Sequence, residues 1–429
     1  MAITGRVPVL VLLGIGPLLL FPSFATAWVW LLTVAALVGL DVALAPRPQR
    51  LEVARRPTQA VRVGTPAASE LVVENPTDRP LRGTLRDAWQ PTAGASGNRH
   101  RVVLAAGDRV RLRTPLLPHR RGDLRAAGVT VRATGPLGLG ARQHTREVPG
   151  VVRALPAFES RKHLPSRLAR LRELDGRSAV RVRGQGTEFD SLREYVRGDD
   201  VRSIDWRASA RSRGVVVRTW QPERDRRVVL VLDTSRTSAA RVPDVPLLDA
   251  TMDAALLLGA LAARAGDRVD LVAGDRRVRT RLRSAGTRAV PELQEAMADL
   301  EPVLAEADWT ALAGAVSGLG RQRALVVLLT ALEPSVVEEG LLAVLPTLTR
   351  HHRVVLAAVR DPELEQLAAA RGDLEQTYAA AAAEQVLARR RHTAATLRAL
   401  GLDVVDADAE RLAPALADHY LLLKSRGLL

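Results

Sequence analysis

The sequence predicts an α/β protein with a mostly parallel sheet, preceded by a transmembrane helical hairpin and a small all-β sandwich. Three observations predict this fold class. Two apolar stretches open the chain, short alternating segments follow them, and apolar runs then alternate with helical patterns. At about 150 residues per domain, the chain length allows two or three domains. The expected parts are residues 1–45 (hairpin), 46–156 (sandwich), 157–227 (linker and charged segment) and 228–429 (α/β domain).

Composition limits the chemistry. The chain is 47% hydrophobic and 25% charged, which is typical of a folded protein. Cysteine is absent, which excludes disulfides and thiolate metal sites and is compatible with a reducing compartment. The net charge is +15, and Lys162 and Lys424 are the only lysines, so arginine supplies the basicity. Such an excess is compatible with nucleic acid or anionic lipid, but the arginines are spread throughout, so we favour a compositional bias and expect no nucleic-acid partner.

The first 45 residues contain two apolar stretches. Ala25–Ala45 is long enough for a membrane helix, which needs about 20 residues, whereas Val7–Phe21 is marginal. A cleaved secretory signal is the alternative, because Arg6, an apolar core and Ala25-Thr26-Ala27 imitate one. We favour a hairpin with both ends in the cytoplasm, because a second span follows at once and arginines flanking a span tend to stay inside. These arginines are Arg47, Arg50, Arg55 and Arg56. Asp41 falls near the end of the second span, where a charge costs little.

The region from Gln49 to Pro156 favours short strands. The alternating runs are Leu51–Val53, Ala60–Val63, Leu71–Glu74, Arg101–Leu104, Arg109–Leu112 and Gly128–Arg132. Turn-prone groups separate these runs, and this spacing predicts a small β-sandwich. No catalytic constellation occurs here, so we expect a spacer or a protein-docking module.

A helix and a charged segment follow the sandwich. Leucines recur at helical spacing between Phe158 and Asp175, which predicts an amphipathic linker helix. Downstream, arginines and carboxylates alternate, and arginine's planar fork pairs carboxylates at two points, so a fixed salt-bridge lattice is expected. We favour a structural clasp that packs aromatic residues onto the following domain, with partner docking as the alternative. These aromatic residues are Phe189, Tyr195, Trp206 and Trp220. The expected partner-binding residues are Arg193, Tyr195, Asp199, Asp200, Arg202, Asp205, Trp206 and Arg211.

Catalysis by this segment is the opposing hypothesis. Paired carboxylates perform acid–base chemistry, and a hydrolase or transferase would use the region around Asp199, Asp200 and Asp205. Adjacent residues on a strand point apart, which disfavours a shared active site for Asp199 and Asp200. The chain also lacks the nucleophile-elbow, zinc-protease and phosphate-loop motifs. We therefore predict that the protein is not an enzyme.

The last two hundred residues alternate strand and helix, which predicts a mostly parallel sheet covered on both faces. The expected strands are Val228–Leu232, Arg268–Ala273, Val278–Leu282, Ala324–Leu329, Arg353–Val359 and Leu402–Val405. The expected helices are Leu247–Ala265, Val290–Leu300, Thr310–Leu319, Val336–Thr349, Glu363–Leu400 with a break near Arg371, and Ala409–Arg426. Ligand sites of open α/β sheets lie at strand tips, which draws attention to the hydroxyl-rich loop at 233–237.

The charged segment resembles the signature of the bacterial "domain of unknown function 58" family. The residues that carry the resemblance are Glu188-Phe189, Leu192 to Tyr195, Gly198 to Asp200, Arg202, Ile204 to Trp206, Ser209 to Arg211 and Glu223-Arg224, with a closing helix at His419 to Lys424. The resemblance covers most of residues 155–429. It implies a partnership with a MoxR-type AAA+ ATPase in the chaperone-like assembly or regulation of unknown client proteins, so we predict a membrane-anchored adaptor or protein-interaction module. It also implies the bacterial inner (cytoplasmic) membrane, with the soluble domains facing the cytoplasm.

The strand order from residue 228 resembles a von Willebrand factor A domain, which implies a Mg²⁺ or Mn²⁺ site at the carboxyl edge of the sheet. Oxygen-only ligands suit these ions. The implied ligands are Asp233, Ser235, Thr237 and Thr310. Ala331 stands where a last aspartate is expected, although Glu333 is near in sequence. A degenerate site that binds no ion is therefore an open alternative.

Overall fold

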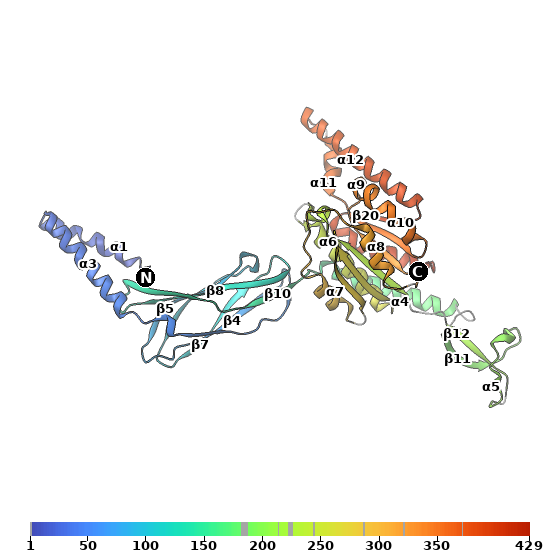
Figure 1. The fold of residues 1–429 in the computed structure, drawn as a ribbon, viewed down its shortest axis with the longest axis horizontal. Coiled ribbons are helices and arrows are strands. Elements are labelled where there is room, and N and C mark those ends of the chain that lie inside the picture. The colour runs from blue at the N-terminus through green and yellow to red at the C-terminus, as the bar shows by residue number, and fades with distance from the viewer. Residues whose placement is uncertain are drawn as a thin grey trace. The chain divides into compact units, whose positions relative to one another are not determined.

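The computed structural model describes residues 2–181, 188–212, 214–221, 226–242, 245–285, 288–320, 322–370 and 372–429. The chain divides into two compact units, Met1–Leu155 and Pro156–Leu429 (Figure 1). The first contains an N-terminal apolar helix and β-sandwich-like sheets, and the second is mixed α/β. The finer division into four parts stays a prediction.

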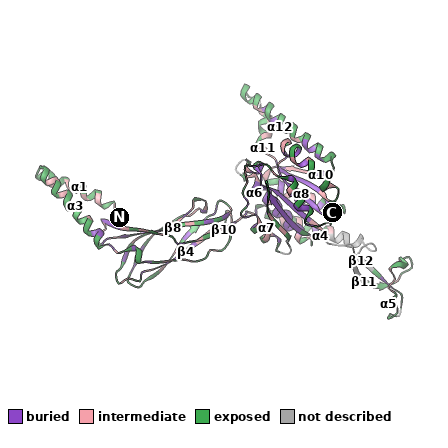
Figure 2. Cartoon of the chain, viewed as in Figure 1, coloured by how far each residue is buried: buried purple, intermediate pink, exposed green. Residues whose placement is uncertain are grey.

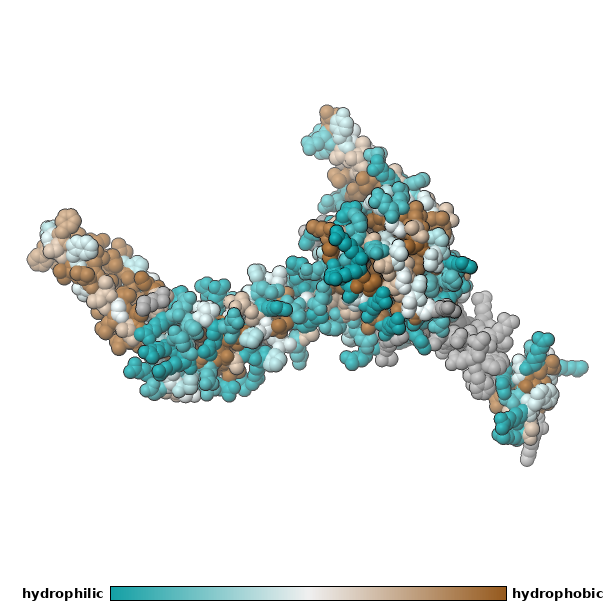
Figure 3. All heavy atoms as spheres, in the orientation of Figure 1, coloured by the Kyte–Doolittle hydropathy of each residue, from teal (hydrophilic) through white to brown (hydrophobic). Residues whose placement is uncertain are grey.

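Three helices open the first unit: α1 (Arg6–Leu13), α2 (Ile15–Leu20) and α3 (Phe24–Leu44). The indole nitrogen of Trp30 donates to the carbonyl of Leu10 at 3.1 Å, which holds α1 beside α3. Among the described residues, Phe24–Arg50 is the one segment long and apolar enough to cross a membrane, and Arg6–Leu20 is shorter. Figure 3 shows these helices as a mostly hydrophobic surface. The membrane crossing of a two-helix hairpin stays a prediction.

The carboxylate of Asp41 is fully buried at the end of α3. It accepts hydrogen bonds from the backbone amides of Leu137 (2.7 Å), Leu139 (2.7 Å) and Gly140 (2.8 Å). A side chain at Gly135 would collide with Asp41, so the glycine permits this close approach. Asp41 therefore binds the helix to a turn of the sandwich, a role that its position in the sequence did not suggest.

The sandwich combines two sheets. One contains β2 (Glu52–Arg55), β4 (Ala67–Glu74) and β7 (Arg109–Leu116) in that order. The other has the order β1 (Ala2–Ile3), β9 (Gly140–Arg146), β8 (Gly122–Thr134), β10 (Val151–Leu155) and β3 (Val61–Arg62), and β5 (Leu81–Trp89) pairs with both β8 and β6 (Arg99–Leu104). The core between the sheets includes Leu71, Leu85 and Val129.

All six predicted runs overlap strands, but β5, β9 and β10 were not predicted. β5 places the charged Asp87 at an inward position, which interrupts its apolar alternation. The outer positions of β9 are polar, and its sequence contains no large aliphatic residue. Periodicity detects strands by apolar residues on one face, so these strands gave a weak signal.

Arg55 is not an exposed membrane-flanking arginine. Its guanidinium is 2% exposed and binds both oxygens of Asp87, at 2.7 and 3.1 Å. It also bonds to Ser69 and lies over the Trp89 ring, 4.8 Å from the centroid. Burial alone would raise the pKa of Asp87, but the hydrogen bonds and charge of Arg55 outweigh burial and lower it. Arg55 therefore has a structural role in the sandwich, and its part in orienting the membrane span stays a prediction.

The second unit contains a six-stranded sheet in the order β17 (Val278–Ala285), β16 (Arg268–Gly274), β13 (Arg227–Asp233), β18 (Leu325–Leu329), β19 (Arg353–Val359) and β20 (Asp403–Ala407). All neighbours are parallel except β17, which is antiparallel to β16. Successive residues of β13 enter opposite core clusters, with Leu230 in one and Val229 in the other. A strand buried on both faces is continuously apolar, as predicted here.

Helices cover both faces of this sheet, and Figure 2 shows the buried strands between them. The helices that pack in the first cluster are α4 (Leu164–Arg181), α6 (Leu247–Arg264), α7 (Ala289–Met297) and α13 (Ala409–Ser425). Those in the second cluster are α8 (Trp309–Ser317), α9 (Pro334–Val336), α10 (Leu342–Thr349) and α12 (Leu374–Ala399). A π-helical turn, Val337–Leu341, separates α9 from α10, so the helix predicted at 336–349 is not continuous.

The predicted break in the long C-terminal helix is present. α11 (Pro362–Ala369) ends before α12 begins, with Asp373 capping α12 through a bond from the Gln376 amide at 2.8 Å. Arg371, named in the prediction, lies outside the described residues. The amphipathic linker helix is also present as α4, and its Leu171 is buried in the core of the second unit. It therefore belongs to the α/β unit and is more than a connector.

Candidate docking hairpin and sheet-edge site

The signature segment forms a two-stranded antiparallel hairpin, β11 (Glu188–Glu194) with β12 (Val216–Gln221). Between the strands the chain makes a short 3₁₀ turn at Val201–Ser203 and the one-turn helix α5 (Trp206–Ser209). We refer to residues 192–218 of this segment as the docking hairpin. The signature residues Glu223 and Arg224 lie outside the described residues.

Asp199 closes the first turn of the docking hairpin. Its oxygens accept from the guanidinium of Arg193 at 2.6 and 2.8 Å, and one also accepts from the Val196 amide at 2.9 Å. The hydrogen bond from Arg193, followed by that from Val196, lowers the pKa of Asp199. Asp199 and its neighbour Asp200 lie in a turn, so the expectation that they occupy a strand was wrong.

Asp205 begins α5. It accepts from the backbone amides of Arg207 and Ala208, each at 3.0 Å, and from Arg218 at 2.8 Å. The Ala208 amide contributes most to a lowered pKa for Asp205, and Arg218 comes next. Asp200 similarly accepts from the Arg202 amide at 2.9 Å. Ion pairs with arginine and hydrogen bonds from backbone amides therefore hold the loop in shape. Aspartate commonly accepts such amide bonds at the N-terminus of a helix.

Apolar side chains on the same hairpin face solvent. Trp206 is 69% exposed, Val201 63% and Val196 62%. Hydrophobic atoms are visible on this hairpin in Figure 3. Tyr195 is partly buried, and its amide donates to the Val215 carbonyl at 2.8 Å. Arg202 and Arg211 are exposed. The hairpin thus brings the eight predicted partner-binding residues into one small segment.

Two aromatic residues of the predicted clasp, Phe189 and Trp220, have side chains outside the described residues. The clasp onto the following domain therefore stays a prediction. Trp206, a third aromatic residue of this set, is exposed.

The loop after β13 is the predicted metal centre. Asp233 is buried and accepts from the Ser235 amide at 2.8 Å and from the Thr330 hydroxyl at 2.6 Å. The hydroxyls of Ser235 and Thr237 lie 3.2 Å apart. A cavity of about 20 Å³ adjoins this network and is large enough for one water molecule. Its lining residues are Asp233, Thr237, Ser238, Leu247, Thr251, Leu329, Thr330, Ala331 and Val359.

The donors at this edge do not fit a divalent cation as they are positioned. Thr310 is exposed at the first turn of α8 and does not line the cavity, and Glu333 is also exposed. The described residues contain no group of three His, Cys, Asp or Glu side chains that could hold a metal. Burial raises the pKa of Asp233, and the hydrogen bonds from Thr330 and Ser235 oppose this shift. The metal site stays a prediction for calorimetry to decide.

A second loop is bound to this edge. The Val303 amide donates to the Thr234 carbonyl at 2.8 Å, and the Arg236 amide donates to the Ala305 carbonyl at 2.9 Å. The Arg236 guanidinium pairs with Glu306 at 2.5 Å, and this bond raises the pKa of Arg236. The two loops are thereby joined at the carboxyl end of the sheet.

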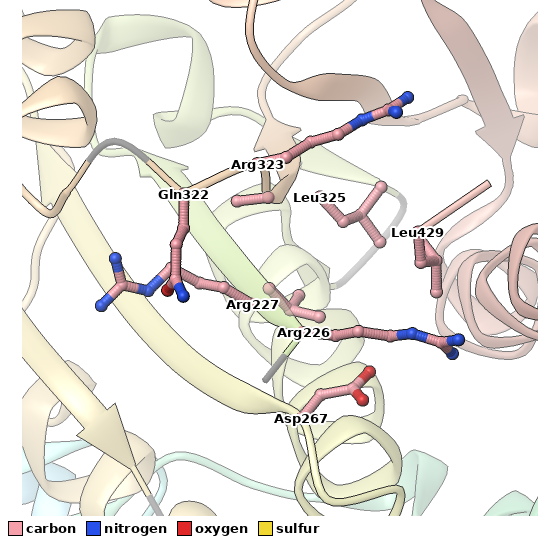
Figure 4. A pocket seen from close by; sticks show the side chains of 9 residues that line it. Arg226, Arg227, Asp267, Gln322, Arg323, Leu325 and Leu429 are labelled. Carbon is pink, nitrogen blue, oxygen red and sulfur yellow. The ribbon is translucent and has the colours of Figure 1, made fainter. Parts of the chain in front are cut away.

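A larger cavity, of about 210 Å³, lies at the opposite edge of the sheet, where β13 and β18 begin (Figure 4). Two of its charged groups, Arg227 and Asp267, have structural partners. Arg227 donates to the Leu319 carbonyl at 2.8 Å, just beyond α8, and Tyr420 donates to Asp267 at 2.5 Å. Arginine at the carboxyl end of a helix is stabilising because the helix dipole is negative there. No sequence motif indicates this cavity. It lies at the strand ends opposite to the predicted ligand site.

One comparison with known proteins gives a family match. The sequence pattern of the family described as "Protein of unknown function DUF58" matches residues 191–398. This match includes the docking hairpin and most of the six-stranded sheet, and it supports the resemblance drawn from the signature residues. No curated protein matches the chain.

Three solved structures share limited similarity. A PapD-like domain of human CEP192 is 14% identical with a TM-score of 0.19, covering 26% of this chain and 91% of its own. A CARDB domain from Pyrococcus furiosus, solved with two metal ions, is 14% identical with a TM-score of 0.19, covering 27% and 92%. Activated alpha-2-macroglobulin from Escherichia coli is 11% identical with a TM-score of 0.21, covering 62% and 16%. At these scores the similarities carry no functional argument.

Proposed function

We propose that the protein is a membrane-anchored adaptor that binds its partner through the docking hairpin. The observation that carries this proposal is that carboxylates of the hairpin are bonded within it, whereas several of its apolar side chains face solvent. Asp199 and Asp205 are bound to arginines and backbone amides, whereas Trp206, Val196 and Val201 remain exposed. Tryptophan anchors dominate many protein interfaces because they bury a large surface with little loss of conformational entropy.

The same bonds argue against the hydrolase or transferase alternative. A general acid needs a proton near neutral pH, and the pKa values of Asp199 and Asp205 are lowered, so both are ionised. A general base needs lone pairs directed at a substrate, and three accepted hydrogen bonds leave Asp199 and Asp205 about one free lone-pair site each, whereas Asp200 accepts one bond. The geometry therefore favours docking over catalysis.

The identity of the partner comes from the family resemblance. It suggests a MoxR-type AAA+ ATPase, with the α/β unit acting as a von Willebrand factor A-like module and unknown proteins as clients. The apolar helix α3 would hold the assembly at the bacterial inner membrane, with the soluble units in the cytoplasm. Helix α3 is long enough to span the bilayer core, which requires about 20 residues.

Affinity purification of the full-length protein from its native membranes, with and without ATP and Mg²⁺, tests this proposal. We expect mass spectrometry to identify an AAA+ ATPase whose recovery depends on nucleotide. Trp206→Ala should reduce its recovery at least tenfold, the effect of a hot-spot residue. Val103→Ala removes another exposed apolar side chain, on the sandwich, and should leave recovery unchanged.

The absence of an ATPase from every preparation would contradict the family-based part of the proposal. Equal recovery with wild type and Trp206→Ala would contradict docking through the hairpin. Turnover of a candidate substrate that Asp199→Asn abolishes, with the fold intact, would favour the enzyme alternative.

The predicted Mg²⁺ or Mn²⁺ at Asp233 has a separate test. Calorimetry on the full-length protein in detergent measures heats of binding for each ion, with Asp233→Ala as the comparison. Binding that Asp233→Ala abolishes would establish the metal site. The donor positions lead us to expect no such binding, in which case docking does not require a metal.

A further inference from the structure

The outer face formed by β5, β6, β9 and the second half of β8 concentrates arginine without any carboxylate, whereas Asp123 at the other end of β8 pairs with Arg153. The outward positions of β5, β6, β9 and residues 130–134 of β8 can be read from the strand register, because alternate residues share a face. They are Arg82, Thr84 and Arg86 on β5, Arg99, Arg101 and Val103 on β6, Thr130, Arg132 and Thr134 on β8, and Gln143 and Thr145 on β9. We call the five exposed arginines of this set the basic face: Arg82, Arg86, Arg99, Arg101 and Arg132.

The register places these charges close together. Arg86 lies directly opposite Arg99, and Thr84 lies between Arg101 and Arg132. Like charges directly opposite each other on neighbouring strands are destabilising. Arg132 bonds to the neutral side-chain oxygen of Gln143, at 3.0 and 3.2 Å, rather than to an acid. Because the fold does not neutralise this face, an external anionic partner would stabilise it.

The opposite sheet of the sandwich is different. Its strand β7 also exposes three arginines, Arg109, Arg111 and Arg113. There, Glu74 lies opposite Arg109 and Glu70 lies opposite Arg113. Carboxylates therefore offset the arginines on one outer face of the sandwich but not on the other. A uniform compositional bias does not explain this difference.

The position of the basic face indicates what kind of anion it meets. β8 ends at Thr134, immediately before the turn whose amides bind Asp41 at the end of α3. Arg132 is thus only three residues, or about 10 Å of strand, from the Gly135 contact with the membrane helix. Thr4 and Arg6 bind the same turn through the carbonyls of Gly138 and Leu137. The apolar helix and the basic face are joined through a single rigid turn.

We propose that the basic face binds the anionic headgroups of the phospholipid bilayer in which α3 is anchored. This inference rests on the membrane anchoring proposed above. Basic residues near an anionic membrane surface each contribute about 1 kcal/mol, or roughly a fivefold change in equilibrium. Nucleic acid is the less suitable partner, because the outward positions contain no aromatic side chain on which bases could stack.

The absence of natural cysteine makes a direct test available. Thr84→Cys, at the centre of the basic face, is labelled with a fluorophore in the full-length protein. The protein is reconstituted into nanodiscs of phosphatidylcholine, with or without phosphatidylglycerol, that carry a quencher on the lipid headgroup. We expect quenching that requires phosphatidylglycerol and decreases at high salt, because salt screens such contacts.

Two sets of variants distinguish this face from charge in general. Replacing Arg86, Arg99 and Arg101 with Gln should reduce the ratio of bound to unbound face about a hundredfold, at about fivefold per arginine. Replacing the same three with Lys should retain the response. Replacing Arg109, Arg111 and Arg113 with Gln removes equal charge from the opposite sheet and should leave quenching unchanged.

Equal quenching in both lipids, no quenching in either, or equal losses in the two Gln triples would each overturn the proposal. Binding of a soluble polyanion in place of the lipid response would also overturn it. Failure of the anchor is distinguishable, because the protein would then not enter nanodiscs of either composition. A protein that enters nanodiscs but shows no lipid-dependent quenching would refute the basic face alone.

Discussion

Asp87 in the sandwich and Asp233 at the edge of the α/β sheet are both buried carboxyl groups with opposite electrostatics. Asp87 has a buried guanidinium partner, Arg55, and its pKa is lowered despite burial. Asp233 accepts hydrogen bonds from neutral donors, Ser235 and Thr330, and burial raises its pKa. The comparison shows that hydrogen bonds from neutral groups only partly offset the effect of burial on the pKa of a carboxyl group, whereas the hydrogen bonds and charge of an arginine outweigh it.

The largest expected effect follows removal of the charge partner. Asp87→Ala leaves the guanidinium of Arg55 buried and unpaired, which should cost about 3–5 kcal/mol of stability. Hydrogen exchange of the β4 and β5 amides in the full-length protein measures this loss. Asp123→Ala breaks the more exposed pair with Arg153 and should cost less than about 1 kcal/mol. Similar losses for the two variants would contradict the importance of burial.

Asp41 extends the comparison to a carboxylate whose donors are backbone amides. Asp41→Ala leaves the amides of Leu137, Leu139 and Gly140 without their acceptor, and should cost about 1–3 kcal/mol. Faster exchange of these amides in the full-length protein is the expected observation. Arg6→Ala removes an exposed bond to the same turn and serves as the milder control. Unchanged exchange in Asp41→Ala would show that the turn is held by other contacts.

The smallest effect is a difference in pH dependence. A lowered pKa means that the contribution of Asp87 is present above its unfolded pKa, about 4, and is lost as the pH falls through its folded value. A raised pKa means that the contribution of Asp233 is complete below about 4 and is lost as the pH rises through its folded value. Local hydrogen exchange across this range should show opposite slopes near β5 and β13.

The variant Asp233→Asn tests whether Asp233 causes the slope near β13, because the asparagine side chain does not titrate. It should flatten the slope near β13 and leave the slope near β5 unchanged. A slope near β13 that persists in Asp233→Asn would assign the titration to another group.

Regular elements with one dominant period were predictable. The apolar run at β13, the leucine spacing of α4 and the alternation of strand and helix after residue 228 each produce the element that periodicity indicates, with ends displaced by a few residues. Strands β5 and β9 escaped detection because Asp87 occupies an inward position of one and the other contains no large aliphatic residue. Both strands depend on contacts with segments that are distant in sequence, and their own residues do not reveal these contacts.

The eight residues predicted for docking do gather in one hairpin, because they are close in sequence and local turns bring them together. The metal set required contacts between distant segments, and there Thr310 lies exposed at α8 while Thr330, not predicted, bonds to Asp233. Local spacing cannot specify which hydroxyl a distant carboxylate will meet.

Sequence by itself determined the classes of structure in this protein: an apolar helix, short strands, and an α/β unit that matches DUF58 over residues 191–398. The helix, the strands and the α/β alternation follow from composition and periodicity, which are local properties of the chain, whereas the family match rests on the signature residues. Tertiary structure alone decided the partners of Asp41, Arg55 and Asp233, and the gathering of arginines on one face of a sheet. The reason is physical: register and burial bring distant residues together, and these contacts decide which groups each polar side chain bonds to.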